Sequence, residues 1–401
     1  MRHTQVTPAI LGLGTAVPPH CVAQSYLSEW LAEALAGQPA LARWVRSLYR
    51  LSGIETRHSC LPDASLPPGG SRFAPTRSLQ EAPTTAERMA IYAREAPAIG
   101  VAAARGALAD LVGDAPEEVA AAAASVTHLI AVSCTGFFAP GLDLAIADRL
   151  GLRHSVERTL VGFMGCSAAF NGMRLAAAIV RARPEARVLV VCAELCSIHA
   201  QPELDRVNLT VTSLFADGAA ACLVGDDPHG GRERIELDRF ATAYAPDTAD
   251  AMSWRIGDHG FRMTLSPQVP RIIGQIAPAA VEALLDGRPR PRHWAIHPGG
   301  PSIVDQVAEA LGLSEEQAAP SRAVLRGYGN MSSPTILFVL RELRERLRAG
   351  RPADPQAAVA MAFGPGLVAE LAHMTYVPAG ITIQHDDPQT RRREDVTVFV
   401  P

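Results

Sequence analysis

Three residues of this chain, Cys166, His297 and Asn330, are of the types that nucleophilic catalysis needs, and each stands close to glycine at a predicted turn. A cysteine thiolate attacks acyl carbons, a histidine can serve as its base, and an amide can donate hydrogen bonds to the oxyanion that forms. Each residue also has an ordinary explanation, as a small buried hydrophobe, a structural histidine or a turn asparagine. Their joint occurrence favours a cysteine-dependent acyl-transfer site.

The surroundings of Cys166 predict a reactive thiol. Residues 160–164 are typical of a buried strand, which turns at Gly165 and leads into an apolar helix over residues 173–180. Free backbone N–H groups and the positive end of the helix dipole would then face the sulfur. Such a setting lowers a thiol pKa from about 8.5 toward neutrality, so we expect a thiolate here.

The elements that must position these residues alternate between strands and helices. The strands are predicted at 6–14, 127–133, 160–164, 187–193, 222–224, 234–244, 294–297, 358–363 and 367–376. One or two helices are predicted within 26–49, and further helices at 84–111, 115–124, 142–150, 173–183, 269–285, 303–311 and 334–348. Residues 60–84 have the composition of a surface loop. This alternation predicts an α/β fold whose sheet is covered by helices on both faces, with a joint near residues 226–234.

Composition excludes several kinds of chemistry. All 37 basic residues are arginine, so mechanisms that need a lysine, such as a Schiff base or a P-loop, are excluded. The formal charge of −4 gives no reason to expect nucleic acid or an anionic membrane as a partner. The seven cysteines form no Cys-x-x-Cys pair, which disfavours disulfides and metal sites. The N-terminal stretch is too rich in Gly and Pro for a secretory signal, and no apolar run reaches the ~20 residues of a membrane span, so we expect a cytoplasmic protein.

Four motifs give the chain a specific resemblance. They are Gly165-Cys166, His-Pro-Gly-Gly-Pro at 297–301, Tyr-Gly-Asn-Met-Ser-Ser at 328–333 and Phe-Gly-Pro-Gly-Leu at 363–367. In this order and spacing they resemble the type III polyketide synthases, the chalcone synthase-like branch of the thiolase superfamily, over residues 9–377. The resemblance implies a thiolase-like fold in which two similar βαβ-type halves form a layered α/β/α/β/α core. Residues 1–232 would carry the nucleophile, residues 233–378 the histidine and asparagine, and residues 379–401 would form a tail that is either an added edge strand or a solvated arm.

The resemblance also implies a role for each site residue. Cys166, His297 and Asn330 would be catalytic, while Phe215 and Phe261 would flank the gate through which a CoA arm enters. The pocket and tunnel residues would be Cys134, Thr135, Ala139, Cys196, His199, Ala200 and Ser332. The CoA-binding residues would be Arg46, Arg50 and Arg57. The chain departs from the family pattern at Glu55 and Thr56, where relatives often have lysine, at Ala216 after the gate phenylalanine, and at Ala362 in the usual Gly-Phe-Gly-Pro-Gly.

The activity that the resemblance implies is a decarboxylative Claisen condensation. An acyl-CoA starter would load onto Cys166, and malonyl-CoA would extend it without a metal or any other cofactor, before cyclisation to a pyrone or resorcinol-type product. The run Glu-Leu-Cys-Ser-Ile at 194–198 resembles bacterial alkylpyrone- and alkylresorcinol-forming members that accept fatty acyl-CoA. The resemblance further implies a homodimer, with the apolar loop 137–140 at the contact.

Three other interpretations remain at this stage. A β-ketoacyl-carrier-protein synthase III shares the three catalytic residue types, although the Pro-Gly-Gly after His297 and the Met-Ser-Ser after Asn330 count against it. A papain-like hydrolase has Cys, His and Asn in the same chain order but a different context around its cysteine. A catalytically silent thiolase-fold subunit would not need the three residues together.

Overall fold

A computed structural model describes residues 6–62, 70–74, 79–227, 230–381 and 397–399 of the chain. Residues 63–69 and 75–78 of the predicted surface loop, and residues 382–396 of the tail, lie outside the described part. Within that part, most strands belong to one mixed sheet with the order β11-β12-β13-β8-β1-β7-β6-β4-β5, and β14 pairs with β8.

The N-terminal half of the molecule contributes five strands of the sheet and the helices that cover them. Its strands are β1 (Ala9–Ala16), β4 (His128–Ser133), β5 (Glu157–Gly162), β6 (Val188–Leu195) and β7 (Asp217–Gly225). Its covering helices are α3 (Thr85–Val112), α4 (Pro116–Ser125), α5 (Leu142–Leu150) and α6 (Ala168–Ala182). The helix predicted over residues 84–111 is α3, which begins after Thr84, whose side chain forms a capping box with Glu87.

The C-terminal half repeats this plan with four strands. They are β8 (Arg234–Tyr244), β11 (His293–Ile296), β12 (Gln356–Gly364) and β13 (Val368–Val377). The helices are α8 (Val269–Leu285), α9 (Pro301–Leu311), α10 (Glu315–Tyr328) and α11 (Thr335–Gly350). Helix α10 was not predicted, whereas β8 and α8 have the predicted bounds.

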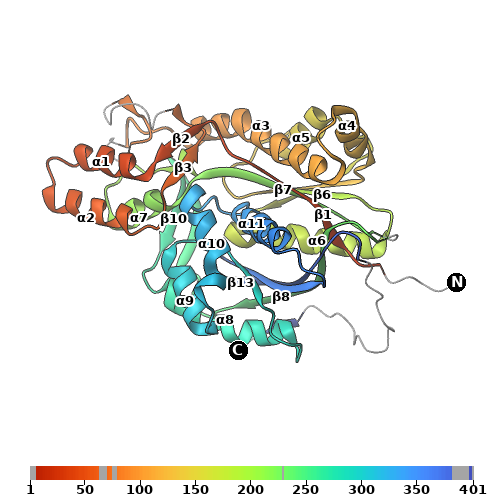
Figure 1. Ribbon diagram of the computed structural model, residues 1–401. Coiled ribbons are helices and arrows are strands. Elements are labelled where there is room, and N and C mark those ends of the chain that lie inside the picture. Colours follow the sequence, from red (N-terminus) through yellow and green to blue (C-terminus); the bar gives the residue numbers. More distant parts are fainter. Residues whose placement is uncertain (1–5, 63–69, 75–78, 228–229, 382–396, 400–401) are drawn as a thin grey trace.

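The helices and strands form alternating layers (Figure 1). One apolar cluster joins α3 to the outer face of the N-terminal strands, and another joins α8 and α9 to the outer face of the C-terminal strands. The third cluster contains α6 and α11, which lie between the two sets of strands. These layers confirm the predicted thiolase-like α/β architecture.

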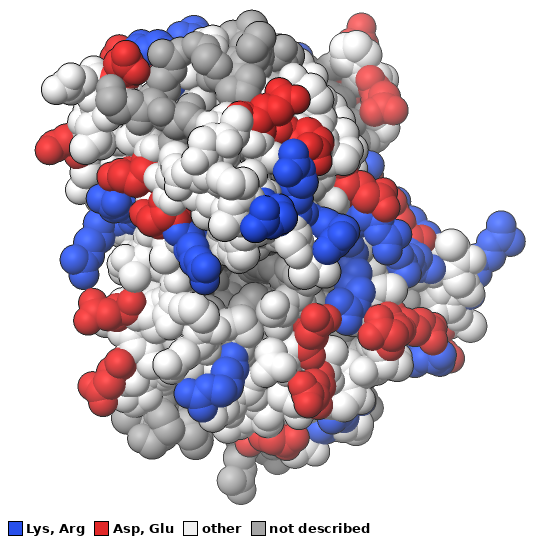
Figure 2. Space-filling model, turned by 90° about the vertical axis from the view of Figure 1, so that its left-hand side faces the viewer, with Lys and Arg blue, Asp and Glu red and all other residues white. Residues whose placement is uncertain are grey.

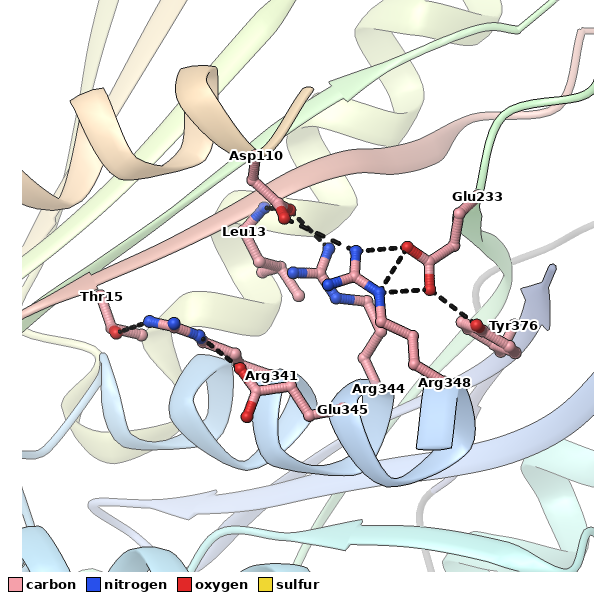
Figure 3. Close-up of polar contacts among 9 residues, drawn as sticks. All are labelled: Leu13, Thr15, Asp110, Glu233, Arg341, Arg344, Glu345, Arg348 and Tyr376. Carbon is pink, nitrogen blue, oxygen red and sulfur yellow. Dashed lines mark hydrogen bonds and ion pairs between the residues drawn. The ribbon is translucent and has the colours of Figure 1, made fainter. Parts of the chain in front are cut away.

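The two halves meet at β1 and β8 and at a cluster of charged groups beside them. Ala9 and Ile10 pair with Glu236 and Ile235 across the sheet. Figure 3 shows Arg344 and Arg348 of α11 converging on Asp110 at the end of α3 and on Glu233 in the joint. Arg344 donates to Asp110 at 2.6 Å, and the Tyr376 hydroxyl donates to Glu233 at 2.6 Å. This cluster ties the inner helix of one half to the outer helix of the other.

A separate group of small elements covers one end of the layered core. It comprises β2 (His20–Ala23), α1 (Gln24–Ala34), α2 (Pro39–Arg50), β3 (Thr56–Ser59), α7 (Arg206–Leu214) and the hairpin β9 (Met252–Gly257) and β10 (Gly260–Leu265). Residues 26–49, predicted to form one or two helices, form the two helices α1 and α2, which pack against α7 around Leu209. These elements lie together on the left in Figure 1.

Two observations bear on the ends of the chain and on membranes. Strand β14 (Thr397–Phe399) pairs with β8 in parallel, so this part of the tail adds a strand. It lies beside an inner strand of the sheet, not at the edge that was predicted as one alternative, because β8 stands between β13 and β1. In the described part of the chain, no single helix is both long and apolar enough to cross a membrane. The helices α3 and α4 pass that test only when taken together, across a bend of 102°.

Candidate active site

Several predicted site residues lie just beyond the carboxyl ends of the parallel strands. Strands β5, β4 and β6 run parallel, so their carboxyl ends lie side by side. The chain continues from β4 into Cys134, from β5 toward Cys166 and from β6 into Cys196. In the other half, β11 and β12 are also parallel, and His297 follows the end of β11.

Cys166 lies in a tight turn between β5 and α6. The 3-10 turn η3 (Gly165–Ser167) precedes α6, which begins at Ala168 and therefore earlier than predicted. Gly165 has φ +71°, and a Cβ there would lie 2.1 Å from Cδ of Pro365, so only glycine fits. Phe163 is also held at φ +59°. The order of strand, turn and helix around the cysteine agrees with the sequence prediction. The prediction of a buried strand was wrong, because β5 ends the sheet and Glu157–Leu160 are exposed.

The expected low pKa of Cys166 is wrong for this structure. Burial raises the pKa of the thiol to about 11, although hydrogen bonds with Ser332 and Asn330 oppose the shift. Removing water from around the sulfur destabilises the thiolate by more than the hydrogen bonds of the neighbouring polar groups stabilise it. The Cys166 thiol is therefore neutral near pH ~7, and a role as nucleophile would require a base.

His297 is in the neutral form that a base requires. The side chain is 1% exposed, and burial lowers the pKa of the imidazole to about 3, so the ring is neutral. Neither ring nitrogen has a hydrogen-bond partner among the described residues. A buried imidazole without protein partners is free to exchange a proton with a ligand or thiol.

Asn330 links the two other residues. Its Oδ1 lies 4.0 Å from Cys166 Sγ and accepts a hydrogen bond from the Ser332 N–H at 2.8 Å. Its Nδ2 donates to the Gly299 carbonyl at 3.2 Å, two residues beyond His297. Because the Ser332 N–H can only donate and the Gly299 carbonyl can only accept, these partners fix which way the amide points.

The cysteine opens onto a large cavity with mostly apolar walls. Its empty volume, including the opening to solvent, is about 1390 Å³. The predicted residues that line it are Cys134, Thr135, Cys166, Cys196, His199, Ala200, Phe215, Phe261 and Ser332. Ala139 does not line it: this residue is exposed in the loop before Pro140, so its place in the pocket of this chain was predicted wrongly.

Family models for the N-terminal and C-terminal domains of chalcone and stilbene synthases match residues 2–228 and 236–378. The chain belongs to the chalcone and stilbene synthase family of type III polyketide synthases. Members are acyltransferases that lengthen an acyl chain by decarboxylative condensation.

Similar proteins come from organisms as different as Mycobacterium tuberculosis and Oryza sativa. The alpha-pyrone synthesis polyketide synthase-like Pks18 of Mycobacterium tuberculosis is 34% identical over 90% of this chain and 89% of its own length. Bisdemethoxycurcumin synthase of Oryza sativa is 33% identical over 92% of each chain. The type III polyketide synthase domain of Steely1 from Dictyostelium superposes with a TM-score of 0.81 at 28% identity, covering 92% of this chain and 99% of that domain. PKS-I of the brown alga Ectocarpus siliculosus gives the same TM-score and identity and covers 94% of this chain and all of its own.

The three arginines predicted to bind CoA in this type III polyketide synthase lie in different settings. Arg46 is exposed and forms an ion pair with Glu29 at 2.9 Å. Arg50 is exposed and has no carboxylate partner among the described residues. Arg57 is buried in the cavity wall, where its guanidinium donates to the carbonyls of Thr212 (2.6 Å) and Phe215 (2.7 Å). Of the three, Arg50 is the one with a free charge at the surface.

Sequence reasoning missed a buried carboxyl group beside the cavity. Glu194, at 0% exposure, accepts hydrogen bonds from the hydroxyls of Ser333 (2.5 Å) and Thr135 (2.6 Å) and from the Cys134 N–H (2.9 Å). Burial raises the pKa of Glu194, while these hydrogen bonds oppose the shift. The group joins the loop after β4 to the loop that carries Asn330. Its signal in the sequence is one acidic residue at the end of an otherwise apolar strand.

Proposed function

We propose that this synthase loads a fatty acyl group from CoA onto Cys166 and extends it with malonyl-CoA, using His297 and Asn330 as the other catalytic residues. The observation that carries the proposal is the 4.0 Å contact between Sγ of Cys166, which lines the cavity, and the Asn330 amide oxygen. The same amide is bonded to the turn that follows His297. Asn330 thus connects Cys166, which faces the space for an acyl chain, with the turn that follows His297.

Loading starts from a neutral pair. As the Cys166 sulfur attacks the thioester carbon of the starter, its proton moves to the neutral His297 ring. The tetrahedral intermediate then expels the CoA thiolate, which takes that proton from His297. Because burial disfavours both charged forms in the resting site, we expect the proton transfer to accompany the attack.

Extension uses the same polar groups for a different purpose. Malonyl-CoA loses CO2, and the electron pair of the broken C–C bond forms an enolate on the thioester. The N–H groups of Asn330 and His297 donate to the enolate oxygen, and such preorganised donors are worth about 3 to 4 kcal/mol each. The enolate carbon then attacks the acyl group on Cys166 and releases the sulfur. Hydrogen bonds stabilise the negative charge of the enolate. We therefore propose that no metal or other cofactor is needed, and that turnover is unchanged by EDTA.

The cavity supports a long apolar starter. Its walls include the small side chains of Cys196 and Ala200 and several aromatic and aliphatic groups. Each buried methylene contributes roughly 0.8 kcal/mol, so a tunnel bounded by small residues favours long chains. One relative is named for alpha-pyrone synthesis. We therefore propose pyrone or resorcinol-type products.

The entrance supports binding of a negatively charged arm. Phe215 and Phe261 line the cavity and are the proposed gate. The face of the molecule with α1, α2 and β10 is hollowed, and basic side chains gather beside the hollow (Figure 2). We propose that the CoA phosphates bind among these groups, with Arg50 in contact and Arg46 and Arg57 nearby.

CoA thioesters and seven free cysteines suit a cytoplasmic enzyme, which cell fractionation would test.

A homodimer is supported by the free side of β5. This strand ends the sheet formed by the described residues and exposes Leu160; Met164, two residues after the strand, and Leu144 of α5 are also exposed. A strand edge with no partner among the described residues favours pairing with a second chain. We expect sedimentation to give a dimer; a stable and active monomer would overturn this part of the proposal.

The decisive experiment is mass spectrometry of the products formed from a panel of acyl-CoA starters and malonyl-CoA without carrier protein. Cys166→Ala serves as the blank. We expect pyrone or resorcinol masses that grow with the starter. A requirement for malonyl-carrier protein, or products equal to those of the blank, would refute the proposal.

A further inference from the structure

His199 and Gln201 flank Ala200 in a segment that lines the cavity, and both bind the strand that carries Phe261. Strand β10 pairs with β9 on one side, and the described residues place no further strand on its other side. The outward N–H and C=O groups of β10 therefore need other partners, because unpaired buried backbone groups are costly. Side chains of the cavity segment meet this need.

The His199 ring binds Phe261 in two ways. The Phe261 N–H donates to Nδ1 at 2.9 Å, and Nε2 donates to the Thr135 carbonyl at 2.6 Å. Because the first partner can only donate and the second can only accept, the ring is neutral with its hydrogen on Nε2. The ring also stacks on Phe261, with centroids 4.3 Å apart and planes at 14°. Burial lowers the pKa of His199 to about 3, consistent with a ring that stays neutral.

Gln201 binds the other side of the same peptide. Its Nε2 donates to the Phe261 carbonyl at 3.2 Å and to the His259 carbonyl at 3.3 Å. It also donates to the His199 carbonyl at 2.9 Å. Both backbone polar groups of Phe261 are thus bound by side chains from residues 199–201.

The segment is itself anchored on α3. Arg88 is fully buried, and its guanidinium donates to the carbonyls of Ala200 (3.0 Å) and Pro83 (2.9 Å) and also to that of Ile198. Gly260 has φ +97°, and a Cβ there would lie 2.7 Å from Cδ of Arg88. The turn before Phe261 is therefore packed directly against this anchor.

We infer that His199 is a positioning residue: together with Gln201 it holds Phe261 as a fixed wall of the entrance and couples that wall to the segment that lines the cavity. The inference rests on the proposed gate role of Phe261. A fixed Phe261 sets where the pantetheine arm of malonyl-CoA lies relative to Cys166. Loss of the clamp should weaken binding of the CoA substrate more than it changes the reactivity of the cysteine.

Two substitutions separate the two hydrogen bonds of the ring. His199→Asn can keep an acceptor at the position of Nδ1 for the Phe261 N–H, whereas His199→Gln can keep only a donor to Thr135. Each variant loses one of the two hydrogen bonds of the ring and its stacking on Phe261, but only His199→Asn keeps the bond to the Phe261 N–H. We expect His199→Gln to raise the KM for malonyl-CoA about tenfold and His199→Asn to stay within about threefold of wild type, because only the bond to Phe261 holds the gate. The rate at which iodoacetamide labels Cys166 should match wild type in both, because this small reagent does not need the gate. Equal KM values in the two variants, or no change in either, would overturn the inference.

Gln201→Met provides an independent test if His199→Gln does not fold. It removes the donor to the Phe261 carbonyl at similar side-chain length, so we expect a comparable rise in KM, and an unchanged KM would count against the clamp. His128→Asn is the matched control, since His128 is also buried and bonded through Nδ1, to Thr127, but does not line the cavity. A wild-type enzyme that forms no product from CoA thioesters would refute the proposed function. Active wild type with unaffected variants would refute only the role of His199.

Discussion

Starter length is the property through which the cavity is most directly testable. Ala200 lines the cavity, and its carbonyl is held by Arg88 at 3.0 Å, so the backbone cannot easily retreat from a larger side chain. The substitution Ala200→Phe should therefore place a ring in the space that the acyl chain occupies. Cys196→Phe tests the same space from a neighbouring position.

The size of the effect follows from the methylenes that the ring displaces. A phenyl group takes up roughly the space of four methylenes, and each buried methylene is worth about 0.8 kcal/mol. The loss for a long starter is then about 3.2 kcal/mol, or about 200-fold in kcat/KM. A starter about four carbons shorter should lose little.

The assay is kcat/KM for saturated acyl-CoA starters of increasing length, with products identified by mass spectrometry. Ala36→Phe is the matched control, because Ala36 is exposed after α1 and does not line the cavity. We expect the optimum to move to shorter chains in both cavity variants and not in the control. An unchanged length preference in both Ala200→Phe and Cys196→Phe would refute the tunnel.

Three further predictions concern the catalytic groups and the joint between the halves. Because burial raises the pKa of the Cys166 thiol to about 11, its alkylation by iodoacetamide should speed up about tenfold per pH unit from pH ~7 to ~10; a plateau below neutral pH would show instead that an ion pair with His297 prevails. Asn330→Ala should lower the rate of malonyl-CoA decarboxylation by about 10² to 10³, and a loss of less than about tenfold would remove it from the proposed mechanism. Burial alone would raise the pKa of Glu233, but hydrogen bonds from Arg348 and Tyr376 outweigh it and lower the pKa, so its stabilisation is present above the unfolded value of about 4.3 and is lost as pH falls through the folded pKa. Glu233→Gln should therefore reduce the free energy of unfolding by about 2 kcal/mol at pH ~7 and by much less at pH ~3 in denaturant titrations; an equal reduction at both values would contradict this.

Local patterns predicted the elements that depend on local interactions. The threonines at 84 and 85 located the start of α3. Continuous apolar runs located β4 and β6, because strands buried on both faces have no polar alternation. The hairpin of β9 and β10 was missed, since charged and polar residues along it leave no such run. Its position depends on partners that are distant in the sequence, among them His199 and Gln201.

The sequence by itself determined the chemistry available at the site, because residue types and their order next to glycine turns are properties of the chain alone. It also determined the family, because the four motifs can be recognised in the sequence wherever they lie in space. Only the tertiary structure decided the state of those groups. Burial makes Cys166 and His297 a neutral pair rather than the thiolate expected from the helix terminus, and it places Arg57 against the Phe215 carbonyl. Desolvation depends on what surrounds a group in three dimensions. These surroundings are built by elements that lie 130 or more residues apart in the chain, so no local sequence pattern encodes them.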